Sequence, residues 1–286
     1  MAIFYDTHAH LDYPDFAADL PEVIQRAQAV GITKIICIGT KVESSQRAIQ
    51  LAEKYPNLFA VVGWHPSYVE EAPDDLRPAL REMGQHPKVV ALGETGLDYH
   101  RIPSKAAAKE AAKKGVPANQ LPPASDFQEQ DNRYKQKQAE LFRQHMEVAA
   151  ELGLNCVIHQ REAQEDTLAQ LEPFSKRVRG VFHCFADDTA ILQRVLALGS
   201  LVSFTGILTF KNGQNIRDDL AAAPMDSFML ETDCPFLAPA PYRGKRCEPA
   251  YVKEISELAA QVKNCSLDQL GAATCATAEK FFKKLS

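Results

Sequence analysis

Eight short apolar segments alternate with amphipathic stretches along this chain, and that alternation restricts its fold more than any other feature. The apolar segments cover residues 2–6, 34–39, 58–63, 88–93, 154–159, 179–183, 200–205 and 227–232. Strands buried on both faces of a parallel sheet have this nearly continuous apolar character. Helices are predicted at residues 21–30, 133–152, 188–198, 249–262 and 267–284. The first three are followed directly by glycine, which is a signal for the end of a helix.

Strands that alternate with helices in this way predict an α/β protein with a (β/α)₈ TIM barrel. The length of 286 residues fits this fold, which typically takes about 250 residues. A doubly wound open sheet is the alternative, but no Gly-x-Gly-x-x-Gly motif follows the first strand. Hydrophobic residues make up 45% of the chain and charged residues 24%, as in ordinary globular proteins. We therefore expect residues 1–286 to form a single barrel domain.

Residues 101–132 interrupt the alternation directly after the fourth predicted strand. They contain Ala/Lys repeats followed by the turn-forming residues Gly115, Pro117, Pro122 and Pro123. A segment of this length without a strand is usually a functional lid or an excursion from the domain. We expect a partly helical surface insertion, with a lid over the active site as the alternative.

Cysteine usage and the absence of targeting signals indicate the compartment. The seven cysteines form no Cys-x-x-Cys pair, and the first residues lead straight into a strand without a signal-peptide pattern. The apolar runs are too short to cross a membrane. We therefore expect a cytoplasmic protein with reduced thiols, and no feature indicates a membrane or an obligate protein partner. The net charge of −5 argues against a protein coated in nucleic acid, although it permits a local basic patch.

Side chains that can bind a metal gather at the predicted strand ends. They are His8 and His10 at the first strand, His65 after the third, Glu94 after the fourth, His159 and His183 at the fifth and sixth, and Asp233 after the eighth. Barrel enzymes build their active sites at this end of the strands. Because residues i and i+2 of a strand point to the same face, His8 and His10 should aim at one point. Imidazole and carboxylate ligands together suit Zn, Mn, Ni, Fe or Co, so the sequence predicts a metal site.

Eight short motifs also resemble the TatD-type deoxyribonucleases of the metal-dependent hydrolase superfamily. In chain order they are DTHAHL at 6–11, GWHP at 63–66, GETGLD at 93–98, VIH at 157–159, FHCF at 182–185, SFTGILTF at 203–210, LETDCP at 230–235 and RGKR at 243–246. The chain departs from the usual family pattern at Ser67, Gln160, Glu162, residues 185–187 and Cys247, none of which is a predicted ligand. The resemblance spans nearly the whole chain.

The resemblance implies two divalent ions, drawn from Mg, Mn, Zn, Ni and Fe, and assigns their ligands. The first ion would be held by His8, His10, Glu94 and Asp233. The second would be held by Glu94, His159 and His183, so that Glu94 is shared. Two such ions can bind a phosphoryl group and activate a water molecule between them. Asp233 would accept the proton of that water as a general base, and a helix N-cap is its alternative role.

Other residues are expected to bind substrate or to orient the ligands. His65 would contact a substrate phosphate or protonate the leaving group, and a strand-end histidine bonded to the backbone is its alternative. Glu231 and Asp98 would accept hydrogen bonds from ligand imidazoles, although Asp98 is also placed to pin only its loop. Arg243, Lys245 and Arg246 form a basic cluster. Guanidinium groups suit phosphate, so this cluster would bind a substrate phosphate. A solvated loop without a ligand is the alternative.

These predictions lead to a metal-dependent hydrolase that acts on phosphodiester bonds, as an exonuclease on single-stranded DNA that uses a metal-activated water. A small-molecule amidohydrolase, lactonase or phosphoesterase on the same barrel is the first alternative. Related barrels often join their metals through a carbamylated Lys, whereas Glu94 at this place favours the nuclease-like branch. A non-enzymatic metal-bound scaffold is the second alternative, and the complete set of six ligands argues against it.

Overall fold

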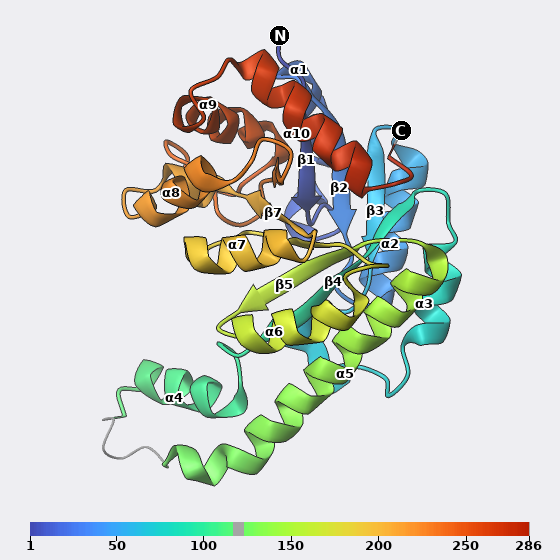
Figure 1. The fold of residues 1–286 in the computed structure, drawn as a ribbon, viewed down its shortest axis with the longest axis vertical. Coiled ribbons are helices and arrows are strands. Elements are labelled where there is room, and N and C mark those ends of the chain that lie inside the picture. Colours follow the sequence, from blue (N-terminus) through green and yellow to red (C-terminus); the bar gives the residue numbers. More distant parts are fainter. Residues whose placement is uncertain (117–122, 286) are drawn as a thin grey trace.

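A sheet of eight parallel strands forms the centre of the molecule in the computed structural model, which describes residues 1–116 and 123–285 (Figure 1). The strands are β1 (Phe4–Ala9), β2 (Ile32–Ile38), β3 (Leu58–Val62), β4 (Val89–Asp98), β5 (Cys156–Arg161), β6 (Gly180–Phe182), β7 (Leu201–Phe204) and β8 (Phe228–Leu230). They pair in chain order from β1 to β8. The backbone N–H of His10 donates to the Cys234 carbonyl (2.8 Å) and that of Asp233 to the His8 carbonyl (2.9 Å). These bonds join β1 to the segment after β8, so the predicted barrel is confirmed and the open sheet is excluded.

Helices connect the strands and pack around the barrel. They are α1 (Leu20–Ala29), α2 (Val42–Lys54), α3 (Arg77–Gly84), α4 (Pro103–Lys113), α5 (Gln128–Leu152), α6 (Gln164–Leu171), α7 (Thr189–Ala197), α8 (Gln214–Ala222), α9 (Val252–Val262) and α10 (Leu267–Phe281). Gly153 follows α5 with φ of 67°, a left-handed conformation that glycine adopts without strain. The glycine signals for helix ends are thus confirmed. Among the described residues, no helix is both long enough and apolar enough to cross a membrane.

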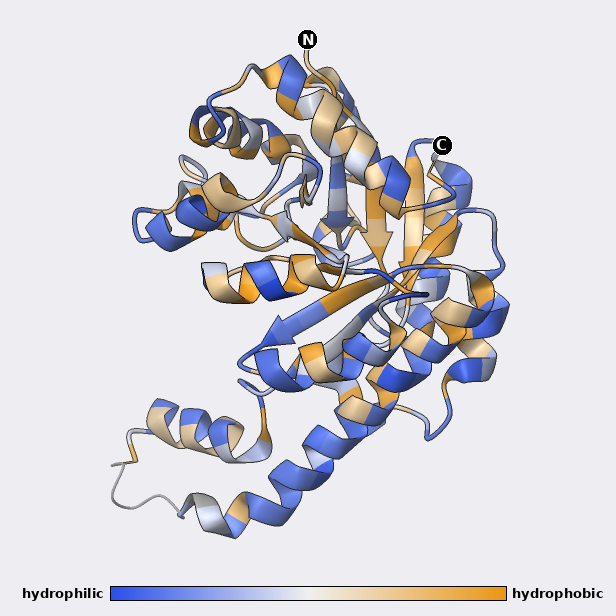
Figure 2. Cartoon of the chain, in the orientation of Figure 1, coloured by the Kyte–Doolittle hydropathy of each residue, from blue (hydrophilic) through white to orange (hydrophobic). Residues whose placement is uncertain are grey.

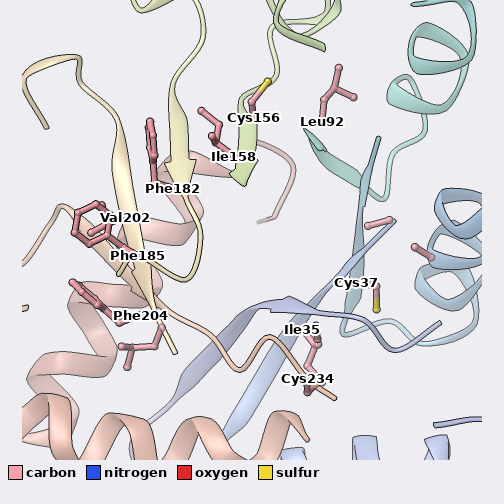
Figure 3. Close-up of a cluster of buried hydrophobic side chains, with 14 of the residues drawn as sticks. Ile35, Cys37, Leu92, Cys156, Ile158, Phe182, Phe185, Val202, Phe204 and Cys234 are labelled. Atoms are coloured by element: carbon pink, nitrogen blue, oxygen red, sulfur yellow. The ribbon is translucent and has the colours of Figure 1, made fainter. Parts of the chain in front are cut away.

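Apolar side chains from the two sides of the strands form two buried clusters. On β2, Ile35 and Cys37 belong to a cluster between the strands and the surrounding helices, part of which Figure 3 shows for several neighbouring strands. Ile36 and Ile38 point the other way and pack with side chains from the other strands. The end of the chain covers this inner cluster with Phe281, Phe282 and Leu285. Apolar packing therefore fills one end of the barrel and leaves the other for polar side chains.

Three strands extend past their predicted ends, because β1 continues to Ala9, β4 to Asp98 and β5 to Arg161. The pairing of β4 with β5 shifts register between Leu92 and Thr95 and then continues to Asp98. Gly93 and Gly96 permit this course, since both have positive φ (131° and 139°) and a side chain on either would collide with the backbone of β5. Glu94 therefore lies inside a strand and not after it. The polar residues Glu94, Thr95 and Asp98 interrupt the apolar pattern. A prediction based on hydrophobicity therefore ends this strand too early.

The described parts of residues 101–132 form α4, a 3₁₀ turn at Ala124–Phe127 and the start of α5. Residues 117–122 of the predicted insertion lie outside the described residues. Asp131 joins the two helices, because its carboxylate accepts hydrogen bonds from the Ser104 N–H (3.0 Å) and hydroxyl (2.6 Å). Figure 1 shows α4 and the start of α5 projecting from the barrel beyond the tip of β5. Figure 2 shows that this part of α5 is mostly hydrophilic, as its exposure requires.

Candidate metal centre

The predicted ligands meet at the C-terminal ends of the strands, beside an open cavity of about 500 Å³. Three sets of side chains bring their ligand atoms within 4.8 Å of one another: His8 with His10 and Asp233, His8 with Glu94 and His183, and His65 with Glu94 and His159. The six residues assigned to metal binding thus lie in one place. His65, which we assigned to substrate, lies there with them.

One group of ligands surrounds the Oε2 oxygen of Glu94. This oxygen lies 3.4 Å from His8 Nε2 and 3.8 Å from His10 Nε2. The two imidazole nitrogens are 3.4 Å apart, as expected for residues i and i+2 that aim at one point. Asp233 Oδ1 completes the group at 3.3 Å from His10 Nε2 and 3.7 Å from His8 Nε2.

A second group surrounds the other oxygen of the same carboxylate. Glu94 Oε1 lies 2.7 Å from His183 Nε2 and 2.9 Å from His159 Nδ1, and these two nitrogens are 3.2 Å apart. Ligands bonded to one tetrahedral ion at about 2.0–2.2 Å are separated from one another by roughly 3.4 Å. The spacing in the first group, 3.3–3.8 Å, fits a metal as it stands. The second group is drawn closer by hydrogen bonds between its members. Glu94 is the residue common to both groups.

Electrostatics keep Glu94 ionised although its side chain is only 2% exposed. Burial alone would raise its pKa. The charge of His183 and the hydrogen bonds from His159 and His183 outweigh burial and hold the pKa of Glu94 well below its usual range. A buried carboxylate in its charged form, surrounded by ring nitrogens, is a site that a divalent cation stabilises.

Two of the imidazoles are oriented by hydrogen bonds on the side away from the centre. His10 Nδ1 lies 3.2 Å from the Ile38 carbonyl and donates a hydrogen bond to it, which leaves Nε2 free to bind a metal. His159 Nε2 lies 3.2 Å from Asp98 Oδ2, so Nδ1 is left facing Glu94. Metal-binding histidines are normally held by such partners.

Glu231 lies beside His183 without a hydrogen bond to it. Its Oε1 oxygen is 3.6 Å from His183 Nδ1 and accepts a hydrogen bond from the backbone N–H of Cys184 (2.7 Å). His183 Nδ1 and His8 Nδ1 are both buried and have no hydrogen-bond partner among the described residues. Glu231 is thus the carboxylate nearest to the outer nitrogen of His183, at a distance that a small rotation would shorten.

The surroundings of His65 keep its ring neutral and fix which nitrogen carries the proton. Its Nδ1 accepts a hydrogen bond from the Ser67 backbone N–H (2.9 Å), so the neutral ring carries its proton on Nε2. Nε2 lies 3.2 Å from Glu94 Oε1 and can donate to it. Burial lowers the pKa of His65 to about 4, which keeps the ring neutral. A nitrogen that carries a proton donates hydrogen bonds and does not bind a metal.

Asp233 is not a helix N-cap, because residues 234–248 contain no helix and all of them are described. Its backbone has a φ of 56°, and its N–H bonds to the His8 carbonyl of β1. Burial raises the pKa of Asp233, but the contact with His10 and the charges of His8 and His10 leave it below its usual value. The side chain is therefore an ionised carboxylate aimed at the first group of ligands.

Asp6 organises this region and was not singled out from the sequence. It is fully buried, and its carboxylate accepts hydrogen bonds from the Thr232 N–H (2.9 Å) and hydroxyl (2.6 Å). Asp6 precedes His8 by two residues and Thr232 precedes Asp233, so these bonds fix the two ends of the ligand group relative to each other. The motif at 6–11 contains Asp6, but nothing local to it indicates a partner 226 residues away.

Comparisons with known proteins agree with this geometry. The family model described as TatD related DNase matches residues 5–283. This chain belongs to the TatD related DNase family. An uncharacterized metal-dependent hydrolase of Bacillus subtilis is 33% identical over 282 residues, which cover 98% of this chain and 99% of that protein. A 3'-5' ssDNA/RNA exonuclease TatD of Citrobacter rodentium is 31% identical over 284 residues, 97% of each chain. The crystal structure of a TatD homolog from Escherichia coli superimposes with a TM-score of 0.82 at 26% identity over 98% of each chain.

The protein is therefore a metal-dependent hydrolase of the TatD family, and the resemblance found in the sequence is confirmed. Members of such a family that act on different substrates would differ in the residues around the cavity. On this chain the cavity wall includes Tyr13, Tyr68 and Phe236 beside the predicted ligands. Phe236 is 50% exposed, so an aromatic ring is accessible at the wall of the cavity.

The three cations predicted to bind substrate are not among the residues that line the cavity. Arg246 donates to both carboxylate oxygens of Asp19 at 2.7 Å, so its guanidinium already has a partner. Arg243 lies 3.7 Å over the ring of Phe210, and Lys245 is exposed. The cations that line the cavity are instead Arg101 and Arg161, from the ends of β4 and β5.

Asp98 offers a test of how the TatD-family ligands are oriented. We predict that Asp98→Asn weakens Zn²⁺ binding about 10- to 100-fold, the usual cost of losing the partner of a ligand imidazole. The amide keeps an acceptor oxygen but removes the charge that would make His159 a stronger ligand. Calorimetric titration of metal-free protein would measure the effect. Asp166→Asn is the matched control, because Asp166 accepts a hydrogen bond from Tyr99 and touches no imidazole in this site. Equal affinities in the two variants would contradict the role of Asp98.

Proposed function

We propose that this protein is a two-metal phosphodiesterase that removes nucleotides from an end of single-stranded DNA. The observation that carries the proposal is the Glu94 carboxylate, with one oxygen facing His8 and His10 and the other facing His159 and His183. A pair of ions held by one carboxylate suits displacement at phosphorus, in which both the attacking and leaving oxygens need stabilisation. The exonuclease name of a relative with 31% identity also supports it.

In this proposal the chain divides its ligands between two ions. His8, His10 and Asp233 would hold one with Glu94 Oε2, and His159 and His183 the other with Glu94 Oε1. A predominance of nitrogen donors favours Zn, Ni or Fe over Mg. When bound, the ions would polarise the phosphoryl group and lower the pKa of a water between them.

The remaining groups would position the substrate and move protons. Asp233 is an ionised carboxylate beside the first ligand group and would accept the proton of the attacking water. His65 Nε2–H would donate a hydrogen bond to a phosphoryl oxygen, and the low pKa of His65 favours this neutral role over that of a leaving-group acid. Arg101 and Arg161 would bind phosphates, and Phe236 would stack against a base. Arg243 and Lys245 keep exposed cationic ends and stay candidates for contacts farther out.

A small-molecule hydrolase is the second candidate, because a cavity of about 500 Å³ also has the size of a small-ligand site. The compartment in this proposal is the cytoplasm, which the seven free cysteines support.

The deciding experiment compares substrates on protein reconstituted with Zn²⁺ or Mn²⁺. We expect end-labelled single-stranded DNA to be shortened stepwise and duplex DNA to be cleaved more slowly. A small phosphodiester should be hydrolysed less efficiently because it lacks neighbouring phosphates and bases. Efficient hydrolysis of a lactone or amide without cleavage of DNA would replace the proposal by the small-molecule candidate. No hydrolysis of any of these substrates would favour the scaffold.

A further inference from the structure

The projecting α4–α5 region carries a charge opposite to that of the rest of the chain. Residues 101–137 contain eight Lys or Arg and four Asp or Glu, a net charge of +4, whereas the whole chain carries −5. This segment begins directly after β4, the strand that supplies Glu94. A basic surface beside the active site of an otherwise acidic protein attracts polyanions to that site.

The cations of this region continue from the cavity along α4. Arg101 and Arg161 line the cavity. Tyr99 connects them to the helices, because its N–H bonds to the Arg161 carbonyl (2.9 Å) and its own carbonyl accepts from Lys105 Nζ (2.9 Å). The ammonium of Lys135 on α5 lies 4.5 Å from the centre of the same tyrosine ring. The two helix cations thus contact Tyr99, which lies two residues before Arg101 and is paired with the backbone of Arg161.

Lys109 extends this row away from the cavity. It follows Lys105 by four residues, and residues at this spacing lie on the same face of a helix, about 6 Å apart along its axis. Lys105 reaches Glu162, which directly follows β5, so this face of α4 is turned toward the end of the barrel that holds the cavity. We call Arg161, Arg101, Lys135, Lys105 and Lys109 the α4 strip.

Three cations of the α4 strip lack a neutralising partner. Arg161, Lys135 and Lys109 form no ion pair with any residue of 1–116 or 123–285, whereas Lys105 pairs with Glu162 and Arg101 lies 3.5 Å from Asp98. Arg246, by contrast, is neutralised by Asp19. Unpaired surface cations are free to replace the counterions of a phosphate backbone.

We propose that the α4 strip binds the phosphate backbone of a single-stranded nucleic acid from the edge of the cavity outward along α4, while the end of the strand occupies the metal centre. The inference rests on the proposed function and adds a binding surface to it. A cavity of about 500 Å³ has the size of a small-ligand site, so a longer strand would extend beyond it. Arg101 and Arg161, where the α4 strip begins, line this cavity. Lys109 and Lys135 do not line the cavity, so we expect a lone nucleotide or a small phosphoester bound there to make no contact with them.

The test uses two double variants with the same change in net charge. Lys109→Gln with Lys135→Gln removes unpaired charge from the α4 strip. Lys253→Gln with Lys280→Gln removes two exposed charges from α9 and α10, at the opposite end of the molecule in Figure 1. Each protein is assayed on a long oligo(dT) strand and on the dinucleotide TpT. Binding of the long strand is also measured across a salt series in an Asp233→Asn background.

We expect the α4-strip variant to show a higher KM for the long strand, by roughly threefold for each lysine that binds a phosphate in the wild type. Its log affinity against log salt should flatten by about 0.7 for each such lysine. The kinetics of the α4-strip variant on TpT should match those of the wild type. The control variant should match the wild type in its KM for the long strand and in its salt dependence. These matches would also show that both variants are folded. Equal KM values and equal salt slopes for the two double variants would overturn the inference. The proposed function would still stand in that case if the wild type hydrolyses DNA. If the wild type cleaves neither substrate, the proposed function fails and the inference fails with it.

Discussion

Glu94→Gln should lower turnover by at least about 10²-fold and reduce the divalent ions bound to the protein below the two per chain that we propose. The two carboxylate oxygens of Glu94 face different groups of imidazoles, at 2.7 Å from His183 and 3.4 Å from His8. An amide has nearly the same shape but only one oxygen, and its NH₂ group cannot bind a cation. It also removes the negative charge that offsets the ions. Turnover and elemental analysis of protein purified without chelator measure both effects.

Glu165→Gln is a suitable control for this experiment. Glu165 is an exposed carboxylate that pairs with Arg194 on the outer helices, so its loss changes the net charge equally without touching the centre. The control should retain wild-type turnover and metal content. If Glu94→Gln did the same, Glu94 would not be the ligand common to the two groups.

The number and order of the strands follow from hydrophobic patterning, because every strand is buried on both faces and flanked by a helix. The ends of the strands do not follow from it. β4 continues through Glu94, Thr95 and Asp98 because it shifts its register against β5, and glycines at 93 and 96 allow the close approach. That extension depends on pairing with a strand about 60 residues later, which an apolar pattern does not contain.

The residues of the site likewise fall into those that the sequence could place and those that it could not. His8, His10, Glu94, His159, His183 and Asp233 could be placed because each is close in sequence to the end of a strand. The contribution of Asp6 could not be predicted from the sequence, because it depends on hydrogen bonds that Asp6 accepts from Thr232 near the other end of the chain. The role of a cation depends on whether a carboxylate neutralises it. Arg246 and Arg161 look alike in sequence, yet Asp19 neutralises only the first, and it is 227 residues away.

Asp233→Asn should reduce kcat by about 10²- to 10⁴-fold, the usual contribution of a positioned general base, with metal content largely retained. The amide oxygen can still contact an ion, but the group cannot accept the proton of the attacking water. Asparagine also tolerates the left-handed backbone at this position, where φ is 56°, so the fold should persist. Single-turnover rates with saturating DNA isolate the chemical step, and elemental analysis of the same samples reports the ions.

Glu162→Gln controls for the backbone, because Glu162 has the same φ of 56° but is exposed and contacts His100 and Lys105 instead of the ligands. The control should keep the wild-type chemical step. Loss of both rate and ions in Asp233→Asn would identify the carboxylate as a ligand whose charge holds the metal, and the proton would then pass to another acceptor. Retention of both would remove Asp233 from the reaction. Only a slow chemical step with the ions in place agrees with a base, because the ligand and base roles of one carboxylate separate when its charge is removed and its oxygen remains.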